Sequence, residues 1–325
     1  MSDRWKTVIK MIVATLGGYL TMRLIQVTGW SKITSAFRQH GSVLLVITLI
    51  YLTFHLLRTL SLKICLPHKI PFWSLFAVRL AGEAISYISI GSILGDSMKV
   101  VLAREKIPVV EGATGVFAEK LIYHLAGAIF LMGGVLIAVG KLGFDRKLFL
   151  FLALAIGFFL LMIYLLSSGV QPLSRILRRF RVRRPELREA VLQTEANLFQ
   201  FRKAHPYAFA FTLIIDLVCY FYASAEVFFL LYVLGMSPRF VDIWYFEAVV
   251  KMANSATMLV PANLGVFEAT HLYLAKQLGF GGANGLIVAL FVRIRAILWA
   301  LIGYSIFLAF LSKGPTAQDI ITDRE

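Results

Sequence analysis

Long apolar runs recur along the chain, separated by short polar or charged stretches. A membrane-spanning helix needs about 20 consecutive, mostly apolar residues. Six runs reach this length: 8–28, 41–61, 113–140, 147–168, 207–234 and 284–311. The pattern predicts an all-α, polytopic integral membrane protein. Because no long polar block interrupts the pattern, residues 1–325 are expected to form a single membrane domain.

Two further apolar regions are long enough to span the bilayer but are interrupted: 72–106 and 242–279. Gly91 and Gly95 fall inside the first, and Pro261 and Gly265 fall inside the second. Gly and Pro disfavour a helix interior, and broken backbone at membrane depth is tolerated only where it is buried in protein or lines a wet cavity. We therefore expect two broken or re-entrant helix pairs, with two ordinary kinked spans as the alternative.

The composition excludes an ordinary soluble fold. Apolar residues make up 59% of the chain and charged residues 16%, against roughly 45–50% and 25% in soluble domains. The chain has a net charge of +15, and its positively charged residues flank the apolar runs. That placement favours loops facing anionic lipid headgroups and disfavours nucleic-acid binding.

Basic residues also predict the orientation of the chain in the membrane. The connection 171–206 holds nine Lys or Arg against three Glu, and connections this basic face the cytoplasm. Counting spans outward from this connection places both termini in the cytoplasm. We expect the membrane to be the plasma membrane. The connection with Arg58, Lys63 and Lys69 falls on the same side. Two other positively charged stretches then lie outside: Arg23–Arg38 and Lys141–Lys147.

The same count makes the two interrupted regions enter the membrane from opposite sides. The spans that follow them, 113–140 and 284–311, then run in opposite directions. Transporters often use such an inverted repeat to build alternating access to a site at the bilayer midplane. The expected halves are about 41–140 and 207–311, and a gapless offset of 170 pairs three glycines: Gly95 with Gly265, Gly115 with Gly285, and Gly133 with Gly303.

Charged residues at bilayer depth are candidates for the functional site, because each costs roughly 2.5–3.5 kcal/mol to insert. They gather in or just after the interrupted regions, where free N–H groups at helix ends also favour anions. The candidate substrate-binding residues are Arg79, Asp96, Lys99, Glu119, Lys120, Asn263, Glu268 and Arg293. Arg295, Asp216 and Glu226 are further charges at depth. Pairing of these charges with one another, as spacings such as Arg79 with Glu83 permit, is the alternative to ligand contact.

Recognised catalytic motifs do not appear in the sequence. There is no phosphate-binding loop, no nucleophile elbow and no metal-spaced set of Cys and His. No cofactor or metal is predicted, and an ATP-driven pump is disfavoured. Cys65 and Cys219 are far apart and lie in or beside apolar runs, so we expect them to act as small buried hydrophobes.

Residues at the two interrupted regions resemble the membrane domain of lysylphosphatidylglycerol synthases, a flippase-like domain family. The resembling features are Gly95-Asp96 followed by Lys99, the Glu119-Lys120 pair, the stretch Pro261-Ala-Asn-Leu-Gly-Val-Phe-Glu268, and Arg293. The likeness covers about residues 8–311, and Pro-x-x-Leu-Gly-x-x-Glu is its most specific part. The first motif departs from the family pattern, because Leu94 and Asp96 stand where a second glycine and a glutamate are expected. That departure leaves the role of Asp96 open.

The resemblance implies a polytopic lipid-handling domain whose substrates include phospholipid-like and polyprenyl-linked molecules. The soluble aminoacyl-transferase domain of the synthases is not expected here, so their reaction is not carried over. We therefore predict a flippase for an anionic lipid, with Arg79, Lys99, Lys120 and Arg293 binding the headgroup. Glu119 and Glu268 would position these cations or carry a coupling proton. A membrane-embedded lipid glycosyl- or acyl-transferase and an accessory protein of a lipid pathway are the alternatives, and protein partners are unknown.

Overall fold

The computed structural model describes residues 30–66, 70–88, 93–142, 204–257 and 260–312, with a few isolated positions outside these ranges. The predicted spans 8–28 and 147–168 lie outside the described residues, as does almost all of the basic connection 171–206. Every regular element of the described part is helical, which confirms the predicted fold class.

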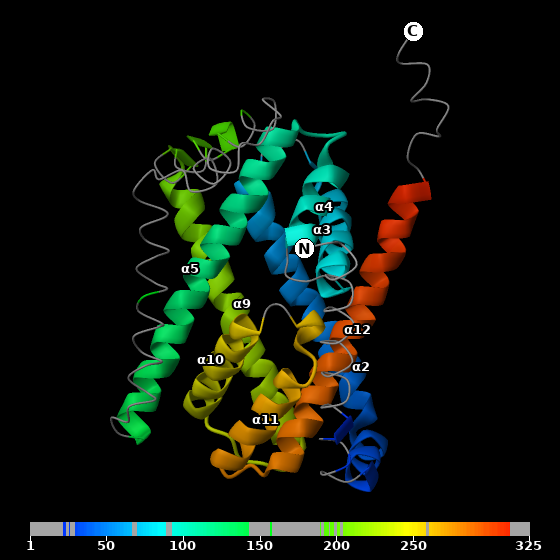
Figure 1. The fold of residues 1–325 in the computed structure, drawn as a ribbon, viewed down its shortest axis with the longest axis vertical. Helices are drawn as coiled ribbons and strands as arrows, with labels where there is room; N and C mark the ends of the chain where they lie inside the picture. Colours follow the sequence, from blue (N-terminus) through cyan, green and yellow to red (C-terminus); the bar gives the residue numbers. More distant parts are fainter. Residues whose placement is uncertain are drawn as a thin grey trace, which may run out of the picture.

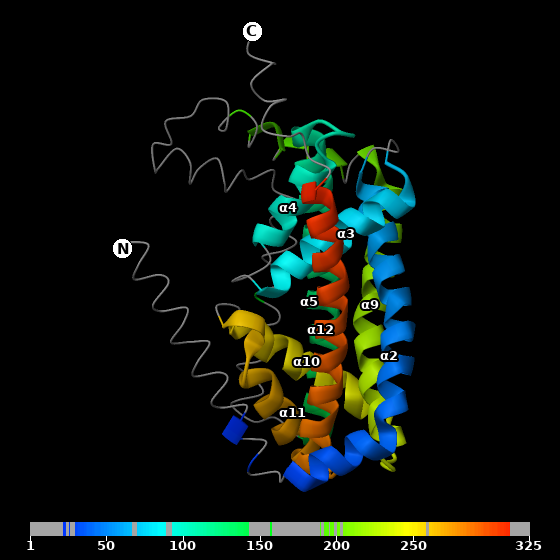
Figure 2. The same cartoon turned by 90° about the vertical axis from the view of Figure 1, so that its right-hand side faces the viewer.

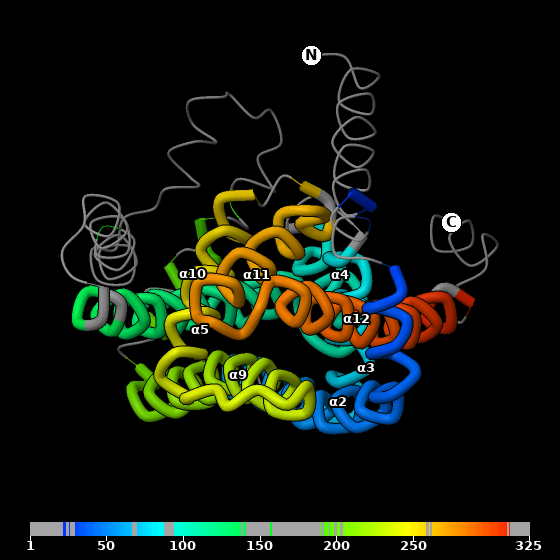
Figure 3. The backbone as a smooth tube through the Cα atoms, turned by 90° about the horizontal axis from the view of Figure 1, so that it is seen from below, coloured from blue at the N-terminus to red at the C-terminus, as the bar shows by residue number. Residues whose placement is uncertain are grey.

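Four long helices form the body of the bundle: α2 (Trp30–Cys65), α5 (Val109–Leu142), α9 (Pro206–Val233) and α12 (Gly282–Ser312). Each contains a stretch long and apolar enough to cross a membrane. These stretches correspond to four of the six predicted spans. Figure 3 shows the layers: α2 and α9 run side by side along one face, and α5 and α12 lie in the next layer.

Helix α2 has two parts joined by a kink at His40, where φ is −118° and ψ is 17°. The first part runs across one end of the bundle, whereas the second part runs along it (Figure 2). Its apolar side is packed onto α12, because the Phe37 ring stacks on Phe291 with centroids 4.3 Å apart. The part of α2 aligned with the other spans therefore begins at Gly41, where the apolar run predicted that it would.

The two interrupted regions each form a helical hairpin. The first hairpin is α3 (Phe72–Ile88) and α4 (Ile93–Ala103); the second is α10 (Phe240–Ala256), the short 3₁₀ helix η1 (Pro261–Asn263) and α11 (Val266–Gln277). At 1.5 Å per residue, a 17-residue helix reaches about 26 Å, less than the roughly 30 Å hydrocarbon core. Each hairpin turns back to the end of the bundle from which it started (Figure 1). The expectation of re-entrant pairs is confirmed, and that of two kinked spans is wrong.

The hairpins enter from opposite ends of the bundle. In Figure 1, α3 and α4 occupy the upper half and α10 and α11 the lower half, and α3 contacts η1 where the hairpins approach each other. The colour gradient also shows α5 descending and α12 ascending. The two halves therefore have opposite directions relative to the bundle axis, as the span count predicted.

Packing between the halves is reciprocal. Helix α3 packs on α12 and α10 packs on α5, so each hairpin lies against the long helix of the other half. Within each half, the second helix of the hairpin packs on the following long helix: α4 on α5, and α11 on α12. The first helix of the hairpin packs on the preceding long helix: α3 on α2, and α10 on α9. Exchanging α2–α5 for α9–α12 thus converts each of these contacts into another that is also present. This pattern is the one that a two-fold inverted repeat predicts.

One of the three glycine pairs occupies equivalent places in the two halves. Gly133 on α5 lies so close to α10 that a Cβ atom there would overlap the Trp244 ring. Gly303 on α12 lies so close to α3 that a Cβ atom would overlap the Leu80 carbonyl oxygen. These are the two reciprocal hairpin contacts. Gly115 lies against Cys65 and Leu66 at the end of α2, whereas Gly285 lies against His271 and Ala275 of α11. Gly95 lies inside α4, whereas Gly265 precedes α11, so the offset aligns these two pairs in sequence only.

Candidate functional site

Five charged side chains on α3, α4 and α5 form a continuous chain of ion pairs, which we call the first-hairpin cluster: Arg79, Glu83, Asp96, Lys99 and Lys120. Lys99 Nζ lies 3.1 Å from a Glu83 oxygen and 2.9 Å from Asp96 Oδ1. Lys120 Nζ lies 3.2 Å from Asp96 Oδ2, and Arg79 Nη2 lies 3.5 Å from Glu83. With three cations and two carboxylates, the cluster has a net charge of +1.

Close packing of α3 on α4 brings this cluster together. A Cβ atom on Gly95 would overlap the Gly82 carbonyl oxygen, so the two helix backbones approach each other more closely than larger residues allow. Lys99, one turn beyond Gly95, then reaches across to Glu83. Gly95 and Asp96, where the sequence predicted a break, lie in the first turn of α4, and the charges of the first hairpin gather there.

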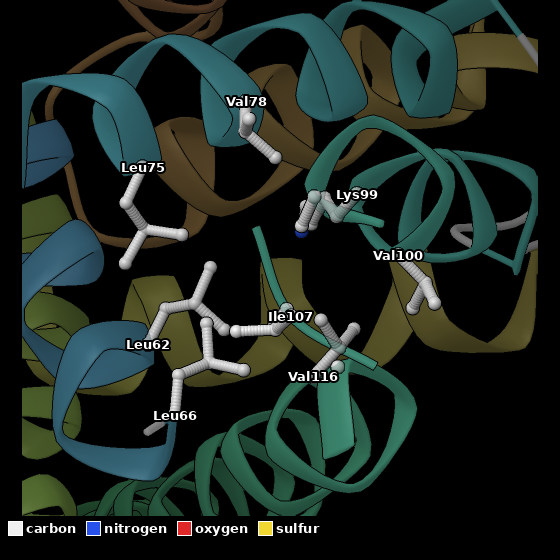
Figure 4. Close-up of a pocket in the computed structure, with 10 residues that line it drawn as sticks. Leu62, Leu66, Leu75, Val78, Lys99, Val100, Ile107 and Val116 are labelled. Atoms are coloured by element: carbon white, nitrogen blue, oxygen red, sulfur yellow. The ribbon is translucent and has the colours of Figure 1, made fainter. Parts of the chain in front are cut away.

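The first-hairpin cluster is buried on one side and open on the other. The Arg79 and Lys99 side chains are each 3% exposed, whereas those of Lys120 and Glu83 are 24% and 38% exposed. The Lys99 stem borders an apolar space between α2, α3, α4 and α5, lined by residues such as Leu62, Val78 and Val116 (Figure 4). That space is too narrow for a water molecule. A ligand would therefore reach the cluster from the Glu83 and Lys120 side.

Arg79 also fixes the protonation of a buried histidine on α2. Arg79 Nη1 lies 3.0 Å from Nδ1 of His55. Because a guanidinium only donates hydrogen bonds, Nδ1 accepts and the ring proton resides on Nε2. His55 is therefore neutral in this arrangement, and it adds no charge to the cluster.

A second group of charges joins three of the long helices, and we call it the Arg58 triad. The Arg58 guanidinium on α2 lies 2.5 Å from Glu119 on α5 and 2.6 Å from Asp216 on α9. The three side chains are 5%, 3% and 0% exposed. Arg58 also stacks over the Tyr123 ring at 3.7 Å. With two carboxylates and one cation, the triad has a net charge of −1.

An ion pair between Glu268 and Arg293 holds the turn of the second hairpin. Glu268 accepts the backbone N–H of Gly265 at 2.9 Å and forms an ion pair with Arg293 of α12. Arg293 Nη1 donates to the Ala262 carbonyl at 3.1 Å. Ala262 and Asn263 have φ of 50° and 49°, a left-handed conformation that side chains other than glycine rarely adopt. The pair therefore stabilises an otherwise unfavourable turn.

Asn263 lies in this turn rather than in a charged cluster. Its side-chain amide is 3.0 Å from the Thr257 hydroxyl, which links the turn to the end of α10.

Arg295 forms an ion pair with Glu226 through two hydrogen bonds, with N–O distances of 2.9 and 2.7 Å. Its guanidinium lies 3.5 Å from the centre of the Tyr51 ring. Arg295 and Glu226 form a balanced, buried pair between α9 and α12.

The structure thus separates the predicted site residues into groups. Arg79, Asp96, Lys99 and Lys120 come together, whereas Glu119 turns toward Arg58, because successive residues of a helix point about 100° apart. Glu268, Arg293 and Asn263 belong to the second turn. Each of the four cations expected to bind a headgroup has a carboxylate partner, so in this conformation the charges pair with one another.

Arg58 corrects one sequence-based expectation. Arg58 is 4% exposed and lies within α2 rather than in a connection between helices, and Lys63 also lies in the last turn of α2. A signal was present, since Arg58 falls inside the apolar run 41–61. Its partner Asp216 is 158 positions away, and no local pattern connects the two residues.

Taken together, the spans, the opposed hairpins and the buried charges define a multi-pass helical membrane protein with two re-entrant hairpins. Residues 8–303 match the family model described as the lysylphosphatidylglycerol synthase TM region. The match covers nearly the whole chain and includes both hairpins, so the chain belongs to this family of membrane proteins of lipid metabolism and transport. The resemblance seen in the sequence is confirmed. Comparison with curated proteins and with solved structures finds no match.

Proposed function

We propose that this protein moves a lipid with an anionic headgroup, a phospholipid or a polyprenyl-linked lipid, from one leaflet to the other. The observation that carries the proposal is the pair of hairpins that enter from opposite ends, each with buried charges. Proteins of alternating access place their substrate site near the midplane, between such opposed elements. Buried charges at this depth are costly and mark substrate or ion pathways.

The reciprocal packing supports a specific motion. Because each hairpin lies against the long helix of the other half, a shift of α2–α5 relative to α9–α12 would move the two hairpins in opposite senses. One end of the bundle would close around the hairpin tips as the other opens. On this proposal the two halves are an inverted repeat within one membrane domain.

The first-hairpin cluster is the proposed headgroup site. A phosphate could exchange with the Glu83 carboxylate, which is the most exposed member of the cluster, and contact Lys99 and Lys120. Charge-assisted bonds of this kind are among the strongest in proteins. The net charge of +1 favours an anion over a neutral headgroup. Glu268 and Arg293 would position the second hairpin rather than contact the phosphate.

We further propose that the end of the bundle where α9 begins faces the cytoplasm of a plasma membrane. The ends of α2 and α12 and the starts of α5 and α9 meet there (Figure 1). Lys63, Arg104 and Lys106 lie in the segments that come together at this end, which agrees with the positive-inside rule. The cysteine introduced by Glu105→Cys should react with impermeant thiol reagents only from the cytoplasmic side.

Leaflet exchange in proteoliposomes tests the function directly. The purified chain would be reconstituted, and labelled anionic, zwitterionic and polyprenyl-phosphate lipids would be followed from leaflet to leaflet. We expect exchange above empty vesicles, selective for an anionic headgroup and reduced about tenfold or more by Lys120→Ala, since one charge-assisted contact contributes roughly 1.5–3 kcal/mol.

The matched control is Lys276→Ala, which removes an exposed lysine at the end of α11 and should exchange lipid at the wild-type rate. Absence of exchange for every lipid class, from protein shown to be folded, would contradict the proposal. Product formation from an activated donor by that same preparation would instead identify a membrane-embedded transferase.

A further inference from the structure

Two charge clusters of opposite sign lie side by side and share helix α5. The first-hairpin cluster has a net charge of +1 and the Arg58 triad a net charge of −1. They join through α5, where Glu119 belongs to the triad and the next residue, Lys120, belongs to the first-hairpin cluster. They also join through α2, where His55 bonds Arg79 and Arg58 stands three residues further on.

The two clusters interact electrostatically, since Glu119 of the triad acts on Lys99 and Arg58 acts on Glu83. Away from bulk water, charges interact strongly. Each cluster therefore offsets the other, and the eight charged groups together are neutral.

Access to the two clusters differs. Glu83 and Lys120 are partly exposed, so a ligand can reach the first-hairpin cluster. The triad side chains are at most 5% exposed, which leaves room for a proton but not for a headgroup. A charge change in the triad must fall on a carboxylate, because arginine does not lose its proton in proteins.

Asp216 is suited to accept that proton. Its Oδ1 bonds Arg58, whereas Oδ2 is buried and makes no ion pair with Arg58. Ser61 lies beside this carboxylate, and its hydroxyl oxygen is also buried. A protonated Asp216 would find in that hydroxyl an acceptor for the new O–H.

We propose that binding of a monoanionic phosphate group at the first-hairpin cluster drives uptake of one proton by the Arg58 triad, on Asp216 or Glu119. The inference rests on the proposed anion site. Without the anion, the clusters balance each other. The anion cancels the charge of +1, leaves the triad with an uncompensated −1, and so favours proton binding there. The proton comes from water, and the phosphodiester keeps its charge.

The other groups around the triad do not replace its carboxylates as the proton acceptor. They are His55 and Cys65 on α2, Arg79 and Glu83 on α3, Asp96 and Lys99 on α4, Lys120, Tyr123 and His124 on α5, and Cys219 and Tyr220 on α9. A proton on Nδ1 of His55 would abolish its bond to Arg79. A proton on His124 would add a positive charge beside Lys120. It would therefore restore the excess positive charge that the bound anion cancels.

Proton uptake can be measured directly. The purified protein, in detergent with a weak buffer and a pH-indicator dye at pH 7, would be titrated with dihexanoylphosphatidylglycerol and, separately, with dimethyl phosphate. We expect about 0.5 to 1 proton taken up per bound anion. Because coupling is reciprocal, binding should be at least about fivefold tighter at pH 6 than at pH 8.5.

Two variants identify the acceptor site. Asp216→Asn and Glu119→Gln each leave Arg58 with one carboxylate, so both keep a balanced pair and should fold. Both should bind the anion without proton uptake and without the pH dependence of affinity. Glu111→Gln, a partly exposed carboxylate two turns earlier on α5, is the control and should behave as wild type.

The outcomes separate this inference from the proposed function. Uptake with the lipid alone would show that the tails are needed, and uptake with dimethyl phosphate as well would show that the phosphate suffices; both support coupling. Anion binding with no proton uptake, or uptake unchanged in both triad variants, would overturn the coupling and leave the transporter proposal standing. A lack of both anion binding and leaflet exchange would overturn the two together.

Discussion

The two hairpins share an architecture but differ in chemistry. The first hairpin contributes Arg79, Glu83, Asp96 and Lys99 to a cluster that Lys120 of α5 completes, with an excess cation and a partly exposed edge. The second contributes Glu268, whose buried pair with Arg293 of α12 holds a left-handed turn, and it also carries the Glu247–Lys251 pair on α10. On the proposed function, the first hairpin is suited to binding a ligand and the second to stabilising its own turn, and the difference lies in side chains rather than in helix placement.

The largest expected effect is on the stability of the left-handed turn of the second hairpin. Glu268→Gln leaves the Arg293 guanidinium buried without a compensating charge, and breaking a buried pair in this way costs about 3–5 kcal/mol. We expect a marked fall in the unfolding temperature in detergent, with increased proteolysis near residue 262. An unfolding temperature within one degree of wild type would show that the pair does not brace the turn.

The next effect tests whether the two hairpins are packed equivalently. Gly133→Val and Gly303→Val both force a side chain into a hairpin contact, and overpacking costs about 1–3 kcal/mol or more. We expect similar losses of stability in thermal unfolding for both. Gly140→Ala, where a Cβ meets open space, is the control. Loss at only one of the two glycines would contradict equivalent packing.

A smaller effect is expected from Arg79→Lys in the first hairpin. Lysine keeps the charge but cannot bond Glu83 and His55 at once in the same geometry, so one buried hydrogen bond is lost at a cost of about 0.5–1.5 kcal/mol. Urea unfolding in detergent would measure this change. A loss as large as that of Glu268→Gln would mean that the first hairpin is braced in the same way as the second.

The smallest effect on stability is expected for Lys120→Ala, because partly exposed ion pairs contribute about 1 kcal/mol or less. The same variant should greatly slow transfer of anionic lipid. A loss of lipid transfer without a comparable loss of stability distinguishes a binding region from a region that stabilises a turn. Equal losses of both would remove the distinction drawn here between the hairpins.

The sequence predicts the parts of this molecule that depend on local chemistry. Apolar run length located four described spans and the start of the straight part of α2, and glycine and proline located both hairpin turns. It does not predict which charges meet. Glu119 and Lys120 are neighbours, yet they serve different clusters, and the partners of Arg58 come from helices far along the chain. Such contacts depend on how helices pack, which periodicity and spacing do not encode.

The reciprocal packing of the hairpins has a consequence for biogenesis. Helix α3 lies against α12, so its packing partner is synthesised about 200 residues later. Contacts between such distant segments form slowly, because a long loop must close first. The first hairpin, with its buried charges, therefore cannot complete its packing until α12 has been inserted. Its assembly depends on completion of the chain, and we expect the N-terminal half, when produced alone, to be a target for quality-control proteolysis.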